Sequence, residues 1–567
     1  MCEAVLTRLS SHCIVGLEGT GLTGRERELL GRIPPAGVIL FSRNVRDVEQ
    51  VRRLTAEVSR IVYGASGYRP LIAADHEGGR ISVLAAAIGA PPTQMAIGRA
   101  SAVPCGEIFR ETARRLRRCG VNTLLAPVAD INTEYLNPVI GVRAFGENPG
   151  EVARLVRESV EALREEGIVS CLKHFPGHGS SRTDSHRTLP FLPFTLEELE
   201  EREMEPFVRG IEAGAETVMV GHVAPRGRLV PASLDAGVIS LLRERLGFDG
   251  VVMTDALEMA GVRAQESGAA GGESVEPQPM REIAARAIAA GNDLLLFSRP
   301  FGEVVDGLET GTSGPEDLED LLAGRGAPSR ERIRRLRAGL RIDGGGDARR
   351  RCCSEIPSDS SAAALGAGGG PAGTVTEGIG KHADIYRSVA RHAVHCAGVS
   401  GTRIPAVEPG RCAVTFLGER EDFANPVVAR FVNGLARLLG TGGWDMPRYD
   451  GGMTVRSSDG YQGPFPGTML RPALRCEAPG TREPMEILAL EASRSCGGEA
   501  GIVVFLNRRP LLRRAYEELC TGSALAVVAG WPYAAHFLPP GKPAIITYGV
   551  YDAAVNAVAA LITGHPV

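Results

Sequence analysis

The sequence lacks the features that would place this protein in a membrane or on a nucleic acid. It contains no run of about 20 apolar residues, so we expect no transmembrane helix and no membrane contact. The first residues, MCEAVLTRLSSHCIVGLEGT, do not combine a charged start with an apolar stretch, so we expect no signal peptide and a cytoplasmic location. The 63 basic residues are balanced by 67 acidic ones, and the net charge of -4 predicts no binding to nucleic acid.

Paired cysteine motifs are also absent. The 12 cysteines are scattered, none forms a CxxC pair, and the adjacent Cys352 and Cys353 lie in a segment with the composition of a linker. Such spacing carries no metal-binding or redox signature. We therefore expect reduced thiols, as is usual in the cytosol.

Eight short apolar segments predict buried parallel strands. They are apolar on both faces, as parallel strands covered by helices are. The segments are 12–19, 36–41, 70–75, 122–127, 168–173, 217–222, 250–255 and 293–298. Amphipathic helical patterns between them include 47–62, 151–167 and 282–291. The alternation predicts an α/β fold in which residues 1–342 form a (β/α)8 TIM-type barrel, with a doubly wound open sheet as the alternative.

The composition changes after the amphipathic helix predicted at 329–342. Residues 343–380 are rich in Gly, Ala and Ser without apolar periodicity, so we interpret them as a flexible linker. Residues 265–279 form a similar insertion within the barrel. Residues 381–567 are predicted to be a smaller α/β domain with a layered sheet. Its expected strands are 412–419, 501–507, 524–530 and 543–549, and its expected helices are 425–439, 510–520 and 552–563.

Polar residues follow several of the predicted barrel strands. They are Asp75, Lys173, His222 and Asp255. Active sites of (β/α)8 barrels are built at the carboxyl ends of the strands, so these side chains are expected to converge. The long segment 126–149 adds Asp130 and Arg143, and loops of that length over a barrel mouth are usually functional.

The segment KHFPGHGSSRTDSH, residues 173–186, concentrates titratable groups. His174 and His178 are four residues apart, a spacing that binds zinc when it falls on a helix. Pro176 and Gly177 oppose a regular helix, and the segment lacks the glutamate of an HExxH motif. From these residues alone, a zinc site that includes His222 and a loop held by polar contacts are both open.

Acid/base chemistry explains the same segment in another way. Asp184 precedes His186, and an aspartate beside a histidine fixes its tautomer and stabilises the protonated ring. Such a histidine can donate a proton and later take one from water. Hydrolysis of a glycosidic bond with retention needs this acid and a second carboxylate, for which Asp255 is the candidate. Asp255 could equally cap a helix after the strand.

Taken together, these motifs resemble glycoside hydrolase family 3, and most of all its bacterial β-N-acetylglucosaminidase branch. Residues 173–186 are similar to that branch's signature loop, K-H-[FI]-P-G-H-G followed by D-S-H. Other segments that match in family order are GVILFSRN (37–44), DHEGGR (75–80), APVADIN (126–132), IGVRAFGENP (140–149), VMVGHV (218–223), LRERLGFDGVVMTDALEM (242–259) and AIAAGNDLLL (287–296). Residues 530–564 resemble the C-terminal domain of two-domain members, more weakly.

The resemblance implies a retaining, exo-acting β-N-acetylglucosaminidase with a role in peptidoglycan fragment turnover. It implies Asp255 as the nucleophile, His186 as the acid/base and Asp184 as its partner. The residues implied to line the sugar pocket are Asp75, Arg143, Lys173 and His174, with Asp130 in the adjoining loop. The substrates would be N-acetylglucosaminides and muropeptides, and we expect no metal and no cofactor.

Two positions depart from the family pattern. Val83 stands three residues after Arg80, where members usually carry an arginine, and this would weaken the support of Asp75. Ala256 replaces an aspartate found in many relatives. Phosphorolysis by the same residues, giving a sugar 1-phosphate, and a degenerate sugar-binding protein are the alternatives. We assign no catalytic residue to the C-terminal domain, and the sequence does not predict the oligomeric state.

Overall fold

The computed structural model describes most of the barrel and parts of the second domain. The described residues are 3–100, 103–185, 188–263, 278–310, 315–324, 326–340, 395–397, 413–418, 425, 427–428, 431–432, 435, 461–462, 469–477, 484–491, 501–506, 523–529, 544–547, 549, 554 and 558. The predicted linker at 343–380 and the predicted helix at 510–520 lie outside them, as does nearly all of the insertion at 265–279. The domain boundaries at 342 and 380 therefore stay predictions.

Eight parallel strands close into a barrel, which confirms the predicted fold. They are β1 (Cys13–Gly16), β2 (Gly37–Leu40), β3 (Leu71–Ala74), β6 (Thr123–Leu124), β7 (Val169–Phe175), β8 (Thr217–Val220), β9 (Val251–Ala256) and β10 (Leu294–Pro300). Their order around the barrel is β1-β10-β9-β8-β7-β6-β3-β2. Each strand overlaps one of the eight apolar segments, because strands that are covered on both faces need apolar side chains on both.

Alternate residues of these strands enter two different apolar layers. Ile14, Ala73 and Met253 belong to the layer inside the barrel. Their neighbours Val15, Ile72 and Val252 belong to the layer between the barrel and its helices. This period of two is the pleat of a β-strand, and it fills the barrel interior with side chains.

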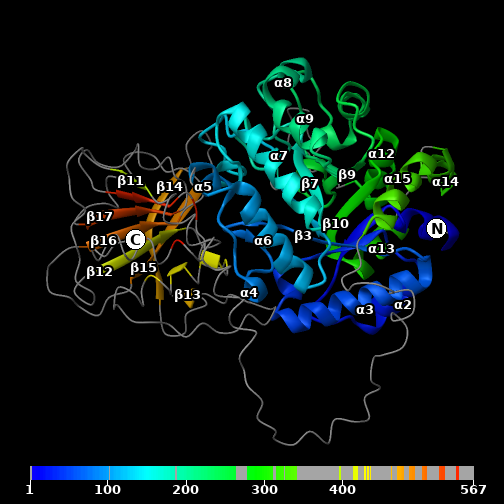
Figure 1. The fold of residues 1–567 in the computed structure, drawn as a ribbon, viewed down its shortest axis with the longest axis horizontal. Coiled ribbons are helices and arrows are strands. Elements are labelled where there is room, and N and C mark those ends of the chain that lie inside the picture. The colour runs from blue at the N-terminus through cyan, green and yellow to red at the C-terminus, as the bar shows by residue number, and fades with distance from the viewer. Residues whose placement is uncertain are drawn as a thin grey trace, which may run out of the picture.

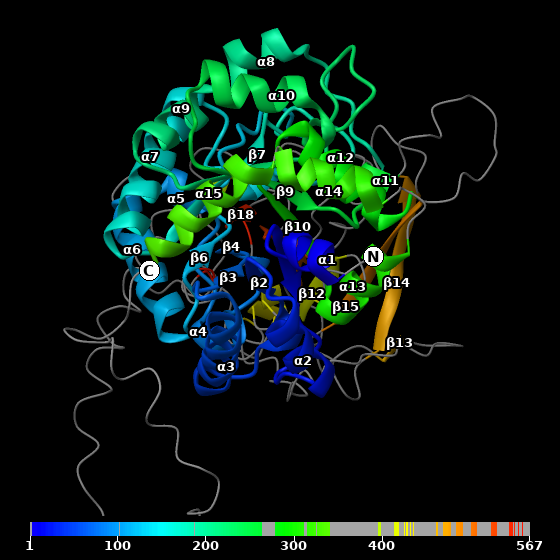
Figure 2. The ribbon, with the colours of Figure 1, turned by 90° about the vertical axis from the view of Figure 1, so that its right-hand side faces the viewer.

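Helices surround the barrel (Figures 1 and 2). They are α1 (Glu3–Ser10), α2 (Gly24–Arg32), α3 (Val48–Ser66), α4 (Ala85–Ile88), α5 (Gln94–Arg99), α6 (Cys105–Arg118), α7 (Pro149–Glu165), α8 (Leu196–Glu203), α9 (Glu205–Glu212), α10 (Ala236–Ser240), α11 (Ala260–Arg263), α12 (Met280–Ala290), α13 (Phe301–Glu309), α14 (Pro315–Gly324) and α15 (Gly326–Ala338). The four helices predicted by periodicity correspond to α3, α7, α12 and α15. Helix α12 ends at Gly291, whose φ of 112° explains the glycine at this position.

A second sheet of eight strands forms the C-terminal part. Its strands are β11 (His395–Ala397), β12 (Ala413–Gly418), β13 (Tyr461–Gln462), β14 (Met469–Glu477), β15 (Pro484–Glu491), β16 (Gly501–Phe505), β17 (Ser523–Val528) and β18 (Ala544–Ile546). The order is β11-β18-β17-β16-β12-β15-β14-β13. The four predicted strands are present and lie parallel to one another at its centre. Strands β13, β14 and β15, which add antiparallel pairs, were not predicted.

The second sheet lies beside the barrel, on the side of α4 and α5 (Figure 1). Arg80 of the barrel donates a hydrogen bond to the carbonyl oxygen of Leu506, which directly follows β16. Within the described residues, no helix has the length and apolar character needed to cross a membrane.

Candidate active site

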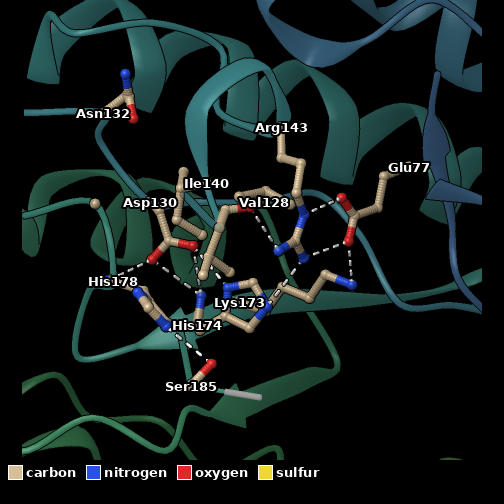
Figure 3. Close-up of polar contacts among 12 residues, drawn as sticks. Glu77, Val128, Asp130, Asn132, Ile140, Arg143, Lys173, His174, His178 and Ser185 are labelled. Atoms are coloured by element: carbon tan, nitrogen blue, oxygen red, sulfur yellow. Dashed lines mark hydrogen bonds and ion pairs between the residues drawn. The ribbon is translucent and has the colours of Figure 1, made fainter. Parts of the chain in front are cut away.

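The residues selected from the strand ends lie together at the carboxyl end of the barrel. They are Asp75 after β3, Lys173 and His174 in β7, Asp255 in β9, and Arg143 in the loop after β6. The pairing of β7 with β8 shifts register between Lys173 and Phe175. The side chains of Lys173 and His174 both reach the polar cluster at the barrel mouth, although they are adjacent in the strand (Figure 3).

Glu77, which the sequence analysis did not select, is the centre of an ion-pair network (Figure 3). Arg143 binds it with two nitrogens: Nε lies 2.8 Å from Oε2 and Nη2 lies 2.8 Å from Oε1. The ammonium group of Lys173 lies 2.6 Å from Glu77 Oε1 and 2.7 Å from Asp75 Oδ1. Only 2% of the Lys173 and Glu77 side chains is exposed, against 25% of Asp75. Asp75 is therefore the member of the network most open to a ligand.

Charge balance keeps Glu77 and Lys173 ionised despite their burial. Burial alone would raise the pKa of Glu77, but the charges of Arg143 and Lys173 outweigh it and hold that pKa well below its usual range. Burial would likewise lower the pKa of Lys173, but Asp75 and Glu77 raise it instead. Two cations thus face two carboxylates, an arrangement in which buried charges are compensated.

His174 is held between Asp130 and Arg143. Its Nδ1 lies 2.7 Å from Asp130 Oδ2, and its Nε2 lies 3.2 Å from Arg143 Nη2. A guanidinium can only donate, so Nε2 accepts and the ring proton is on Nδ1, donated to Asp130. The geometry therefore selects one tautomer of the ring, with the proton on Nδ1.

Asp130 also ties the signature loop to the barrel. This fully buried carboxylate accepts from the backbone N–H of His174 at 3.2 Å and of His178 at 2.7 Å. Burial opposes its ionisation, but His174 and His178 bring the pKa of Asp130 below its usual value. Asp130 thus lies buried beneath the signature loop and not at the surface of that loop.

The loop continues to Ser185, which is anchored on two sides. Its hydroxyl lies 3.2 Å from His178 Nε2, and its carbonyl oxygen accepts from Gly261 N at 3.1 Å. Gly261 belongs to α11, which follows the strand of Asp255. The half-buried Asp184 therefore lies in a loop joined directly to the segment after Asp255. His186, the predicted acid/base, lies outside the described residues.

Asp255 lies inside β9, before α11 begins at Ala260. It is half-buried, and its Oδ1 accepts from Ala256 N at 2.7 Å. It is therefore not the N-cap of that helix. His222 supports the same backbone, because its Nε2 lies 2.9 Å from the Ala256 carbonyl oxygen and its Nδ1 lies 2.7 Å from Ser233 Oγ.

Two of the three candidate zinc ligands, His174 and His222, use both ring nitrogens for other partners, whereas within the described residues His178 uses only Nε2, for Ser185. His174 uses both of its nitrogens for Asp130 and Arg143, and His222 uses both for Ser233 and Ala256. Across the described part of the chain, no group of three or more His, Cys, Asp or Glu residues is placed to hold a metal ion. His174 and His178 are both tied to Asp130, whereas His222 belongs to a separate hydrogen-bond network with Ser233 and Ala256.

The two departures from the family pattern have different surroundings. Val83 packs against the apolar core, and its backbone N–H donates to the Asp75 carbonyl oxygen at 3.0 Å. Asp75 nevertheless has a cationic partner in Lys173. The Ala256 backbone N–H donates to Asp255, and the Ala256 carbonyl oxygen contacts His222 Nε2. These contacts do not depend on the side chain at position 256.

Comparison with known proteins identifies the family. The model of the glycosyl hydrolase family 3 N-terminal domain matches residues 20–318. A beta-hexosaminidase of Chromobacterium violaceum is 35% identical over 329 residues, which cover 55% of this chain and 89% of that protein. A beta-hexosaminidase of Xanthomonas oryzae pv. oryzae is 38% identical over 264 residues, covering 44% of this chain and 75% of that protein.

Solved structures extend the likeness of fold to both parts of the chain. A glycoside hydrolase family 3 beta-N-acetylglucosaminidase from Paenibacillus sp. has a TM-score of 0.68. The match covers 99% of this chain and 97% of that one, at 23% sequence identity. At this identity the similarity concerns the fold alone, and it includes the second sheet.

Proposed function

Since the chain belongs to glycosyl hydrolase family 3 and is therefore a glycoside hydrolase, we propose that it is a retaining, exo-acting β-N-acetylglucosaminidase. The curated relatives named beta-hexosaminidase support the choice of sugar. The reaction releases terminal β-linked N-acetylglucosamine through a glycosyl-aspartate intermediate.

One contact carries the assignment of the catalytic residues. The Ser185 carbonyl accepts from Gly261 N at 3.1 Å, and this joins the loop of Asp184 to the segment that follows Asp255. The two segments expected to supply the acid/base and the nucleophile are far apart in the sequence but meet at one barrel mouth. A retaining glycosidase needs both groups on either side of one glycosidic bond.

In the first step, the Asp255 carboxylate attacks the anomeric carbon and the bond to the leaving oxygen breaks. His186 donates its proton to that oxygen, and Asp184 stabilises the charged ring beforehand. In the second step, neutral His186 takes a proton from water, which attacks the anomeric carbon and releases Asp255. Two inversions at the same carbon leave the product in the β configuration.

The buried ion-pair network would hold the sugar. Two of the three N–H donors of Lys173 face Asp75 and Glu77, so within the described residues one is left for a hydroxyl group. The partly exposed Asp75 can accept from hydroxyl groups, and Arg143 and His174 form the adjoining wall. A pocket built from such fixed polar groups recognises a chain end, which favours exo cleavage.

The substrates would be N-acetylglucosaminides released from peptidoglycan, including muropeptides, acted on in the cytoplasm. Release of N-acetylglucosamine from purified muropeptides, compared with chitooligosaccharides, tests this choice of substrate.

Hydrolysis of an aryl β-N-acetylglucosaminide by the full-length protein tests the activity. We expect Asp255→Ala to lower kcat by about a thousandfold or more, because the covalent step is lost. Asp249→Ala is the matched control: this exposed aspartate lies just before the same strand and pairs with Arg335. Equal rates for wild type and Asp255→Ala would overturn the proposal.

The same assay decides between water and phosphate as the acceptor. Identification of the first product by NMR, with and without phosphate, distinguishes β-N-acetylglucosamine from a sugar 1-phosphate. An α-configured sugar as the first product would rule out the retaining mechanism.

A further inference from the structure

The hairpin formed by β4 (His76–Gly78) and β5 (Ile81–Ser82) has contacts on two sides. Toward the barrel mouth, Glu77 holds Arg143 and Lys173. Away from it, Arg80 donates from its guanidinium to the Leu506 carbonyl oxygen. Leu506 directly follows β16, one of the central strands of the second sheet. Residues 77–80 thus link the sugar-binding network to the second domain.

A second hydrogen bond fixes the backbone of the same hairpin. Asn425 Nδ2 donates to the Arg80 carbonyl oxygen at 3.2 Å. The Oδ1 of Asn425 accepts from Val427 N at 2.9 Å and from Val428 N at 3.3 Å. The backbone N–H groups of Val427 and Val428 therefore hold the Asn425 side chain in the orientation in which its amide nitrogen reaches the barrel.

A third contact supports the hairpin from behind. Gly79 N donates to the Pro91 carbonyl oxygen at 2.9 Å, and a side chain at Gly78 would collide with Pro92. The next residue, Thr93, meets Gly549 of the second domain so closely that a Cβ there would lie 2.5 Å from Thr93 Cγ2. Gly549 comes shortly after β18, and Leu506 comes directly after β16. Both of these residues, which contact the barrel, therefore follow parallel strands of the second sheet.

We propose that the second domain is a positioning element for the sugar-binding network, which it holds in place by clasping the β4–β5 hairpin through Arg80 and Asn425. The kinetic part of this proposal rests on the proposed function. The matched family segment ends at residue 318, so the clasp is contributed by a part of the chain beyond that segment.

The physical need for such a clasp lies in the hairpin itself. Its two strands have three and two residues, too few for independent stability. Its one buried carboxylate, Glu77, must nevertheless stay in register with two buried cations, and a displaced Glu77 would leave them without compensation. Polar sites need supporting contacts to hold such geometry, and Arg80 and Asn425 are those contacts on the outer side.

The clasp can be opened from either domain in the full-length protein. Arg80→Ala removes the side-chain hydrogen bond to Leu506 but keeps the backbone carbonyl that Asn425 binds. Asn425→Asp removes the donor on the other side but keeps an acceptor for the N–H groups of Val427 and Val428, since aspartate caps helices as asparagine does. Arg337→Ala is the matched control: this arginine also binds backbone carbonyls, those of Tyr68 and Arg69, but at the opposite end of β3.

Two measurements are made on each variant. Hydrogen exchange in residues 76–83 reports the hairpin directly, through the bonded amides of Gly79 and Val83. Steady-state kinetics on an aryl β-N-acetylglucosaminide reports the pocket. We expect Arg80→Ala to speed exchange in the hairpin and to raise KM by roughly tenfold, with a smaller change in kcat. Asn425→Asp should act in the same direction, Arg80→Lys should recover part of the loss, and Arg337→Ala should leave both readouts at the wild-type values.

The outcomes separate this proposal from the assigned activity. If neither wild type nor variant hydrolyses the substrate but exchange in the hairpin still rises, the proposed function fails and the clasp is supported. Unchanged exchange in both Arg80→Ala and Asn425→Asp would overturn the clasp. Faster exchange with unchanged KM would overturn the positioning of the sugar-binding network.

Discussion

Glu77 shows how much of this site depends on a single carboxylate. It accepts hydrogen bonds from Nε and Nη2 of Arg143 and pairs with the ammonium group of Lys173, all at less than 3 Å. From the segment DHEGGR, sequence reasoning selected Asp75, at the end of the strand, but not Glu77. The Arg80 side chain reaches Leu506, and Glu77 points toward Arg143 and Lys173 (Figure 3). The direction of each side chain is set by the hairpin β4–β5, which no sequence periodicity indicates.

Glu203, at the end of α8, is a further buried carboxylate near the site, and among the described residues it forms no ion pair. It packs against Gly177 of the signature loop and is only 1% exposed. Neither of its oxygens has a hydrogen-bond partner with good geometry among the described residues. Burial, with the nearby charge of Asp130, raises the pKa of Glu203 to about 7, and Arg202 and Thr133 oppose this only in part.

This raised pKa predicts a pH dependence of stability. Between the unfolded value of 4.5 and about 7, the folded state keeps a proton that the unfolded state loses. Stability should therefore fall as pH rises through this window, by at most about 3 kcal/mol, and stay lower above it. Glu203→Gln carries no such charge, so its melting temperature should exceed that of wild type by more at pH 8 than at pH 5. A difference that is the same at both pH values would contradict the prediction.

At the scale of elements, the buried parallel strands were predictable, whereas the antiparallel strands of the second sheet and the loops were not. The barrel strands were found because burial on both faces requires continuous apolar runs. Strands β14 and β15 were missed, since they pair through polar segments such as MLRPALRCE, in which Pro472 argues against a strand. The convergence of Asp75, Lys173 and Asp255 followed from the fold, whereas the contact of Ser185 with Gly261 depends on a loop whose path has no sequence pattern.

The signature loop, residues 173–186, is the element that the proposed chemistry depends on most. His178 is buried, and burial lowers its pKa to about 4, so it is neutral at working pH. Its backbone N–H is bound to Asp130 and its ring to Ser185. A loop held by polar contacts was one of the two interpretations that the residues of this segment left open. The contacts place that support next to Asp184.

Removing the Ser185 hydroxyl should therefore affect proton transfer more than binding. We expect Ser185→Ala to lower kcat about three- to tenfold on glycosides with poor leaving groups, which need the proton most. Activated aryl glycosides and KM should change little. Ser180→Ala is the matched control, because that hydroxyl is buried in the same loop without a partner among the described residues. Equal losses for good and poor leaving groups would argue against a positioning role.

The whole molecule combines a nearly neutral surface with a highly charged pocket. The net charge of -4 arises from 63 basic and 67 acidic residues, so no strong field attracts a charged ligand from a distance. Many surface charges are paired locally, as in the contact of Arg157 with Glu161 on α7. The charges of Lys173, Glu77 and Arg143, by contrast, are removed from solvent at the barrel mouth. Recognition should therefore depend on the buried network and not on the surface.

This contrast predicts that salt will hardly affect the reaction with an uncharged substrate. Salt screens exposed charges strongly and buried pairs only weakly. Raising NaCl from about 0.05 to about 0.5 M should change KM for a neutral aryl β-N-acetylglucosaminide by less than about twofold. Asn425→Asp, measured in the same series, adds a charge on the far side of the hairpin and controls for screening between the domains. A steep rise of KM with salt in wild type would mean that exposed charges hold the sugar, contrary to the ion pairs of Glu77.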